Sequence, residues 1–345
     1  TTNAAPEKIQ EVFKDSFYEN EYGTVGVVTS NTNDETLKVV EVTPYRRESA
    51  YSDKRRPDRV EFAGKLEDDL KRRDFTINAI ALRLIRETKT GEYEAEIEDC
   101  YEGQEDLEKK IVRTVGNPEE RFAEDALRLV RAVRIAVELD FEIDTDTRRA
   151  ITKHAGELRH IAAERIRDEF VRILLSENPK RGLEISCELG ILRLVMPELL
   201  EGKGVAQNQA HAFDVLEHTL RTLAHAAKKG FSLPVRLAAL FHDIGKPTTR
   251  RWSEEKNDWT FYGHDVVGSK MTLQILTRLK FGRQDAENIA RLVRWHLFNY
   301  KLKRDDQYYL ELKNIGEEPK DIEDSEGDLQ ETTDSAIRRL IRNVG

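Results

Sequence analysis

The chain has 345 residues, of which 39% are hydrophobic and 35% are charged, and its formal net charge at pH 7 is −9. This length predicts two or three domains with real hydrophobic cores, and the high charge content favours long, solvated helices. The acidic total excludes a chain that is basic throughout, but nucleic-acid binding depends on local patches and is compatible with it.

Cysteine content and hydropathy indicate the compartment. Two cysteines, Cys100 and Cys187, are too few for a disulfide framework or a thiolate zinc cluster. No apolar run approaches the roughly 18 residues of a membrane span, and no signal peptide is visible. We therefore expect a cytoplasmic protein with no membrane partner. Nothing in these features predicts an oligomeric state.

Short β-type runs and polar loops make up the first part of the chain. Residues 25–28 and 37–42 predict the two strands of a hairpin, and residues 92–97 predict a further strand. Residues 78–86 are apolar and leave strand and helix open. After Pro118 the pattern becomes helical, with apolar residues at helical spacing.

A dense charged segment lies between these strands: Lys71-Arg72-Arg73-Asp74-Phe75-Thr76-Ile77-Asn78-Ala79. The adjacent Arg72 and Arg73 could hold phosphate oxygens as planar forks. Asp74 and Asn78 could hydrogen-bond a ribose hydroxyl or a base edge. A charged helix start capped by Asp74 is the plainer alternative. We favour a nucleotide-binding element.

Residues 119–139 predict one helix, on which Glu124 and Asp125 share a face with Arg128 at spacings of four and three residues. Taken alone, this pattern favours an ordinary surface ion pair. The alternative is base selection, because a carboxylate beside a guanidinium presents an acceptor next to donors. Cytosine and adenine fit that order of groups, whereas guanine and uracil present the reverse order.

Histidines gather in the last third of the chain, where six of the eight lie between residues 211 and 296. A lone histidine on a helix is usually structural. Grouped imidazole and carboxylate ligands from separate helices instead favour a divalent transition metal that activates water against a phosphoester. The candidate ligands are His218, His242, Asp243, His264 and His296.

Five segments in chain order resemble the bacterial class II CCA-adding tRNA nucleotidyltransferase and poly(A) polymerase family, in the form with an appended HD-type phosphohydrolase domain. The segments are Arg72–Ala79 (RRDxTxNA), Asp99–Leu107 (Asp-x-x-x-Gly-x-x-Asp-Leu), Glu124–Arg128 (EDxxR), Glu164–Glu169 (ERxxxE) and Ala239–Pro247 (the HD signature). The resemblance extends over the whole chain.

The resemblance implies an α+β chain in three parts. Residues 1–117 would form a small mixed-sheet nucleotidyltransferase head, residues 118–205 an all-α neck and RNA-binding body, and residues 206–345 an all-α HD domain. The implied activity is addition of C, C and A to the 3′ end of tRNA, with CTP and ATP as substrates. Two metal ions, Mg²⁺ in our prediction, would assist the transfer in the head.

The resemblance also assigns roles to residues. Glu41 would be a catalytic carboxylate near the metals. The implied nucleotide-binding residues are Arg72, Arg73, Asp74, Asn78, Asp99, Glu124, Asp125, Arg128 and Arg131. The implied neck residues are Glu164 and Arg165, and the HD metal ligands are the four histidines and Asp243 named above.

The family pattern places a Gly-Gly element and an Asp-x-Asp pair just ahead of a segment like Thr1–Glu7, and a closing HD aspartate a little beyond the segment 333–339. The expectation from this comparison is a head and an HD domain truncated at those two points. Such a chain would bind CTP or ATP but add nucleotides poorly, because Mg²⁺ needs several oxygen ligands in strict geometry.

Three other functions share these features. A poly(A) polymerase or an enzyme that adds only A has every motif quoted above. An HD phosphohydrolase with a degenerate nucleotide-binding head would act on cyclic nucleotides or RNA ends. A tRNA-binding module without catalysis would bind with strong salt dependence and no turnover.

Overall fold

The computed structural model describes residues 1–19, 23–29, 34–49, 59–87, 91–207 and 212–297. The chain forms two compact units, one of residues 1–169 with 185–194 and the other of residues 170–184 with 195–345. The three domain boundaries expected from the sequence stay a prediction. Residues 298–345 of the expected HD domain lie outside the described part.

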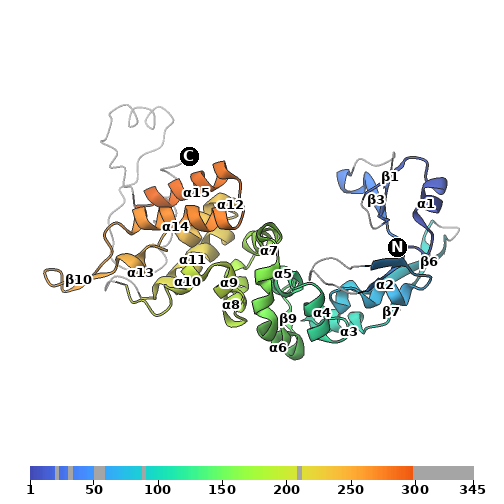
Figure 1. The fold of residues 1–345 in the computed structure, drawn as a ribbon, viewed down its shortest axis with the longest axis horizontal. Helices are drawn as coiled ribbons and strands as arrows, with labels where there is room; N and C mark the ends of the chain where they lie inside the picture. The colour runs from blue at the N-terminus through green and yellow to red at the C-terminus, as the bar shows by residue number, and fades with distance from the viewer. Residues whose placement is uncertain (20–22, 30–33, 50–58, 88–90, 208–211, 298–345) are drawn as a thin grey trace, which may run out of the picture. The chain divides into compact units, whose positions relative to one another are not determined.

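The first unit begins with short strands and helices (Figure 1): α1 (Pro6–Val12), β1 (Ser16–Tyr18), β2 (Val25–Val28), β3 (Val39–Val42), β4 (Arg46–Ser49), β5 (Arg59–Phe62), α2 (Leu66–Lys71), β6 (Ile80–Glu87), β7 (Tyr93–Asp99), α3 (Gly103–Lys109) and β8 (Ile111–Val112), with 3-10 turns at Glu35–Leu37 (η1) and Thr76–Asn78 (η2). The sheets are small. Strands β1, β2 and β3 form one antiparallel sheet, while β4 pairs with β5 and β6 with β7.

The predicted hairpin is confirmed, because Val25 of β2 pairs with Val42 of β3 in antiparallel register. The apolar run that left strand and helix open is strand β6. A small core of Leu70, Ala79 and Val115 lies beneath the charged segment, so that segment is attached on its apolar side. The mixed α and β character expected for this part of the chain is therefore confirmed.

The rest of the first unit is mainly helical: α4 (Pro118–Glu124), α5 (Leu127–Leu139), β9 (Glu142–Ile143), α6 (Thr145–His154), η3 (Ala155–His160), α7 (Ala163–Leu175), α8 (Pro179–Glu188) and α9 (Leu192–Val195). Helices α7 and α8 each cross the boundary between the units. Strand β9 pairs with β8 in parallel register.

The prediction of one helix over residues 119–139 is wrong, because the helix breaks at Asp125. This residue has extended backbone angles (φ −142°, ψ 105°) and terminates α4. Its carboxylate Oδ1 accepts a hydrogen bond of 3.0 Å from the amide of Leu127 at the start of α5. An aspartate that satisfies a free amide at a helix start stabilises a new helix there.

The second unit contains α10 (Pro197–Leu200), α11 (Val215–Lys228), α12 (Leu233–Phe241), α13 (Lys246–Thr249), β10 (Arg251–Ser253), β11 (Asp258–Thr260), α14 (His264–Arg278) and α15 (Arg283–Trp295). Helix α11 packs on α12, α12 on α15, and α15 on α14 (Figure 1). The apolar faces of these helices meet in the core. One example is α15, which buries Ala286, Ile289, Ala290, Leu292 and Val293.

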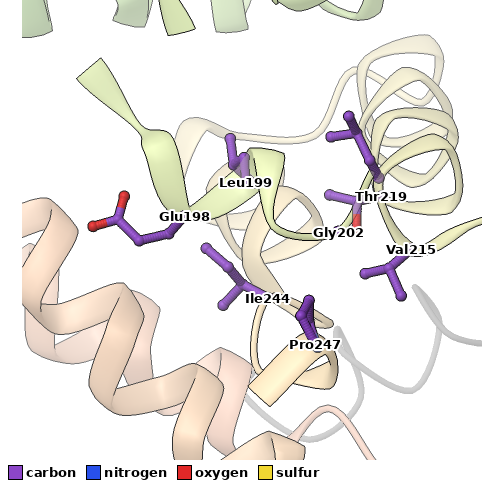
Figure 2. Close-up of a pocket in the computed structure, with 8 residues that line it drawn as sticks. Glu198, Leu199, Gly202, Val215, Thr219, Ile244 and Pro247 are labelled. Carbon is purple, nitrogen blue, oxygen red and sulfur yellow. The ribbon is translucent and has the colours of Figure 1, made fainter. Parts of the chain in front are cut away.

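A small cavity lies where α10 and α11 meet the segment between α12 and α13 (Figure 2). Leu199, Val215, Ile244 and Pro247 contribute much of its apolar lining. Its enclosed space suits about one water molecule, which makes it a packing gap and not a ligand site. Among the described helices, none combines the length and the apolar character that crossing a bilayer requires.

Candidate functional site

We call residues 71–79 the clamp segment. Its two adjacent arginines are oriented by Asp69. Arg72 Nη2 lies 2.6 Å from Asp69 Oδ1, and Arg73 Nη2 lies 3.0 Å from Oδ2. The Asp69 carboxylate is fully buried at the end of α2. Burial opposes its charge, but the Arg72 guanidinium, helped by Arg73, outweighs this effect and lowers the pKa of Asp69. The Asp69 carboxylate therefore fixes the guanidinium groups of both arginines.

The Asp74 carboxylate, expected to hold a sugar, makes its bonds within the protein. Arg131 Nε and Nη2 donate to Oδ2 at 2.9 and 2.5 Å, and Asn78 Nδ2 donates to Oδ1 at 3.1 Å. Burial disfavours the charged form, but Arg131 and Asn78 more than compensate and lower the pKa of Asp74. In this structure Asp74 therefore positions Arg131 and the exposed Asn78.

Two arginines join the clamp segment to helices α4 and α5. Arg121 Nη1 donates to the carbonyl oxygen of Lys71 at 3.2 Å, and Arg128 Nη2 donates to that of Arg72 at 3.1 Å. Arg128 also forms an ion pair of 2.7 Å with Glu124. The structure thus brings the charged segment and the predicted base-selecting residues into direct contact.

Asp125 and Arg128 do not share a helical face, because the chain breaks between them. The carboxylate of Asp125 instead pairs with Arg165 at the start of α7, where Nη2 lies 2.8 Å from Oδ2. The predicted neck residue Arg165 therefore contacts the predicted base-selecting residue. Glu164 is exposed, and within the described residues no partner is recorded for it.

Two other predicted residues have separate local settings. Asp99 ends β7, and its carboxylate accepts bonds of 2.8 Å from the amides of Gly103 and Gln104 at the start of α3. Glu41 is exposed on β3, opposite Gly26 of β2. In the described part of the head, no three acidic, histidine or cysteine side chains come close enough to form a metal site by themselves.

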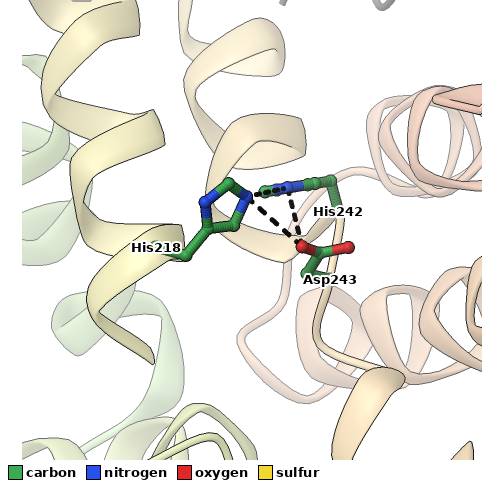
Figure 3. Close-up of side chains that lie close together, drawn as sticks. All are labelled: His218, His242 and Asp243. Carbon is green, nitrogen blue, oxygen red and sulfur yellow. Dashed lines mark hydrogen bonds and ion pairs between the residues drawn. The ribbon is translucent and has the colours of Figure 1, made fainter. Parts of the chain in front are cut away.

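The five predicted HD ligands form one cluster in the second unit, which we call the histidine–aspartate cluster. His218 Nε2 and His242 Nε2 lie 3.4 and 3.1 Å from Asp243 Oδ2 (Figure 3). His264 Nε2 and His296 Nε2 lie 3.4 and 3.8 Å from the other oxygen, Oδ1. Asp243 therefore belongs to two groups of three potential ligands.

Backbone carbonyls fix the orientation of three of these imidazoles. The Nδ1 atoms of His242, His264 and His296 lie 2.7 to 2.9 Å from carbonyl oxygens three residues earlier. A proton on Nδ1 satisfies that contact and leaves the Nε2 lone pair directed into the cluster, as metal ligation requires. Burial lowers the pKa of His296 to about 4, so this ring is neutral at pH 7.

Lys246 is the cation nearest to the shared carboxylate. Its Nζ lies 2.7 Å from Asp243 Oδ2 and 2.6 Å from Gln207 Oε1. Burial disfavours a charge on Asp243, but His242 and Lys246 outweigh it and lower the pKa of Asp243. The carboxylate is therefore ionised at neutral pH, which suits a metal ligand.

A close backbone contact brings α14 to the cluster. A Cβ atom added at Gly245 would lie 2.3 Å from the carbonyl oxygen of His264 and 2.7 Å from the amide of Gly268. Only glycine permits this approach. Gly245 thus sets the distance between Asp243 and the imidazole of His264.

The donor set of the cluster fits a divalent transition metal. Neutral imidazoles and one ionised carboxylate are the ligands that such ions prefer, and the carbonyl contacts provide the supporting hydrogen bonds usual for metal-bound histidine. Sequence reasoning found every member of the two groups. It missed Asp69, Gln207 and Lys246, although the spacing of Asp69 from the two arginines, three and four residues on a helix, is a recognisable signal.

Comparison with known families covers most of the chain. The model described as the poly A polymerase head domain matches residues 1–113. The model described as the probable RNA and SrmB-binding site of polymerase A matches residues 140–202, and the HD domain model matches residues 215–331.

Curated relatives agree with these matches. The chain is 46% identical over 184 residues to the CCA-adding enzyme of Ligilactobacillus salivarius, which covers 53% of the chain and 42% of that protein. It is 39% identical over 247 residues to the A-adding tRNA nucleotidyltransferase of Deinococcus radiodurans, with 70% and 54% covered. It is 35% identical over 325 residues to the CCA-adding enzyme of Limosilactobacillus reuteri, with 92% and 74% covered.

The matched part of the chain thus spans about half the length of the first two relatives and three quarters of the third. Among solved structures, the Bacillus stearothermophilus CCA-adding enzyme in complex with CTP is similar, with a TM-score of 0.51 at 25% identity. That similarity covers 99% of this chain and 82% of the other.

Proposed function

Since the chain belongs to the CCA-adding enzyme family, we propose that it is a tRNA nucleotidyltransferase that adds C, C and A to tRNA from CTP and ATP. The observation that carries this proposal is the contact of the clamp segment with helix α5 through Arg128 and Arg131, which brings it beside the predicted base-selecting residues. A phosphate-binding fork and a base-reading group must lie close together for one nucleotide to reach both.

The triphosphate would bind to the two guanidinium groups that Asp69 orients. Because Arg72 and Arg73 are already fixed, less side-chain entropy is lost when the anion binds. Asn78, held by Asp74, would hydrogen-bond the sugar. Mg²⁺ would supply charge neutralisation at the reacting phosphate, with Glu41 as one of its oxygen ligands.

Base selection would use Asp125 and Arg128 from the two sides of the helix break. Asp125 is held by Arg165 and the Leu127 amide, which both donate to Oδ1, while Oδ2 accepts from Arg165 Nη2 and has a second lone pair for a base amino group. Within the described part of the chain, Arg128 bonds its neighbours through Nη1 and Nη2, which leaves the Nε–H group for cytosine N3 or adenine N1.

Incorporation of labelled CTP and ATP into tRNA that lacks its CCA end tests this function. Asp125→Ala should lower kcat/KM for both nucleotides about 10- to 100-fold, the loss typical of one charge-assisted hydrogen bond. Glu120→Ala, at an exposed position on α4, is the matched control. No incorporation by the unmodified chain would exclude catalysis, and incorporation of A alone into tRNA ending in CC would favour an A-adding enzyme. The measured rate also checks the expectation of weak addition.

The histidine–aspartate cluster supports a second function, metal-dependent phosphoester hydrolysis. We propose that it would hold two divalent transition-metal ions, with His218, His242 and Asp243 as the ligands available to one and Asp243, His264 and His296 as those available to the other. When bound, such ions activate water and neutralise phosphate charge. Hydrolysis of a 2′,3′-cyclic nucleotide should require added metal and be lost in His242→Ala; hydrolysis that survives this change would contradict the assignment.

A further inference from the structure

A β-hairpin connects the two halves of the histidine–aspartate cluster. It runs from Lys246, which contacts Asp243, through α13, β10 and β11 to His264. The two ends of this connection are close, because Lys246 Nζ lies 5.5 Å from the centre of the Phe261 ring and the Phe261 carbonyl contacts His264 Nδ1. The root of the hairpin is therefore at the cluster itself.

Aromatic rings form an open surface on this hairpin. Trp252 and Trp259 pair across the strands with ring centres 5.2 Å apart and planes at 77°. Trp252 is 50% exposed, and Tyr262 is 73% exposed. A tryptophan that is half exposed leaves much apolar area in water, and flat rings in this situation are suitable for stacking on nucleic-acid bases.

Arg250 provides a cation beside these rings. Its guanidinium carbon lies 3.6 Å above the centre of the Trp259 ring. Its Nε atom is buried and finds no hydrogen-bond partner among the described residues, which is costly for a charged donor unless an acceptor arrives. Lys246 begins α13, and Arg250 follows its last residue with extended backbone angles, so the two cations lie at opposite ends of this short helix.

The charges divide along the hairpin. Lys246, which contacts the cluster, Arg250 and Arg251 lie at the root, whereas the turn at the tip carries Glu254 and Glu255 with one cation, Lys256. Anionic ligands are therefore favoured at the root and disfavoured at the tip. Arg250, at the root of the hairpin, could therefore bind a second phosphate of a substrate whose first phosphate is at the cluster.

We propose that Arg250 and Trp252 bind the nucleotide next to the reacting phosphoester, so that the cluster acts on the end of a single-stranded oligonucleotide in preference to a free mononucleotide. This inference rests on the second proposed function. In the reaction, a water oxygen forms a bond to phosphorus, the bond from phosphorus to one ribose oxygen breaks, and a proton passes from the water to that oxygen.

Two substrates in parallel test the proposal: a 2′,3′-cyclic mononucleotide, and a short oligoribonucleotide ending in the same cyclic phosphate. The intact chain should have the higher kcat/KM for the oligonucleotide. Trp252→Ala should lower the ratio of the two kcat/KM values about 10- to 100-fold, the range for loss of one stacked base. Trp252→Phe should restore most of the ratio, because it keeps an aromatic face.

Leu273→Ala, at a partly exposed position on α14, is the control, and its ratio should equal that of the intact chain. A ratio that is unchanged in Trp252→Ala would overturn the proposal. So would an intact chain that hydrolyses the mononucleotide at least as efficiently as the oligonucleotide.

Fluorescence gives a measurement independent of hydrolysis. The chain has three tryptophans, so the double variant Trp259→Phe, Trp295→Phe leaves Trp252 as the sole tryptophan emitter. Adding the oligonucleotide should quench its emission, and absence of quenching would overturn the proposal whether or not the cluster is active. Quenching without hydrolysis of either substrate would retain the binding element and overturn only the phosphohydrolase function.

Discussion

Adding one methyl group at Gly245 should separate the two halves of the histidine–aspartate cluster. The new Cβ would lie 2.3 Å from the His264 carbonyl oxygen, about 1 Å short of an ordinary contact. The oxygen belongs to the backbone and the new Cβ is attached directly to it, so neither atom can move away by side-chain rotation. The start of α14 must therefore move, and His264 must move with it.

The size of the effect follows from this displacement. Overpacking of this kind costs about 1–3 kcal/mol in the free energy of unfolding. Ligand distances tolerate only about 0.2 Å of error, so a shift of about 1 Å should weaken the metal group of His264 and His296 by at least about 10-fold. The group of His218, His242 and Asp243 takes no ligand from α14, the helix that must move, and should keep its ion.

Metal content after dialysis against Ni²⁺ or Mn²⁺ measures this outcome, with chemical denaturation in parallel. We expect two ions per chain before the change and one in Gly245→Ala. Gly268→Ala is a matched control from the same contact, because its Cβ would lie an ordinary 3.4 Å from the Gly245 amide. Two ions retained in Gly245→Ala, with unchanged stability, would refute the reasoning.

Three further predictions concern buried charges. Asp74→Asn should lower the free energy of unfolding of the head by about 2 kcal/mol at pH 7, since it removes the nearer of the two carboxylates that pair with Arg131 and leaves only Glu169, at 3.7 Å. Because the folded pKa of Asp74 is lowered, its contribution is complete above the unfolded value of about 3.9 and is lost as the pH falls through the folded value. The stability gap between the two proteins should therefore begin to narrow below about pH 4 and close at lower pH, and a gap that stays constant on acidification would contradict the assignment. Lys246→Met should tighten Ni²⁺ binding about 10-fold in calorimetry, because it removes the cation that competes for Asp243; weaker binding would instead make Lys246 a support of the site. Arg236→Lys should destabilise the second unit by about 2 kcal/mol in denaturant titration, since a lysine cannot bond the carbonyls of Leu174, Ser176 and Phe231 together, and an unchanged midpoint would show these bonds to be dispensable.

The histidine–aspartate cluster was predictable because packing of an apolar core alone gives no reason for polar side chains at these positions. Adjacent His242 and Asp243 follow an apolar helix, where desolvation of a charge is costly without partners. Residue type and order along the chain were sufficient to name all five members. The sharing of Asp243 between two groups was not predictable, because it depends on how four helices pack.

The helix break at Asp125 shows a different limit. Apolar periodicity continues across residues 119–139, and neither proline nor glycine interrupts it. The local signal was the aspartate ahead of the apolar run of α5, which can satisfy a free amide as well as form a surface ion pair. Periodicity alone could not decide between these two uses, and the partner that favours the break, Arg165, lies 40 residues further along.

The clamp segment is attached to α4 and α5 through its main chain, so these contacts do not depend on its own side chains. Arg121 and Arg128 bond the main-chain carbonyls of Lys71 and Arg72, groups that every amino acid possesses. Replacing the side chain of Lys71 or Arg72 would therefore change the charge that the segment presents and keep both main-chain hydrogen bonds. Under the proposed function, single substitutions in the clamp segment would therefore change how the triphosphate is held without requiring a new architecture.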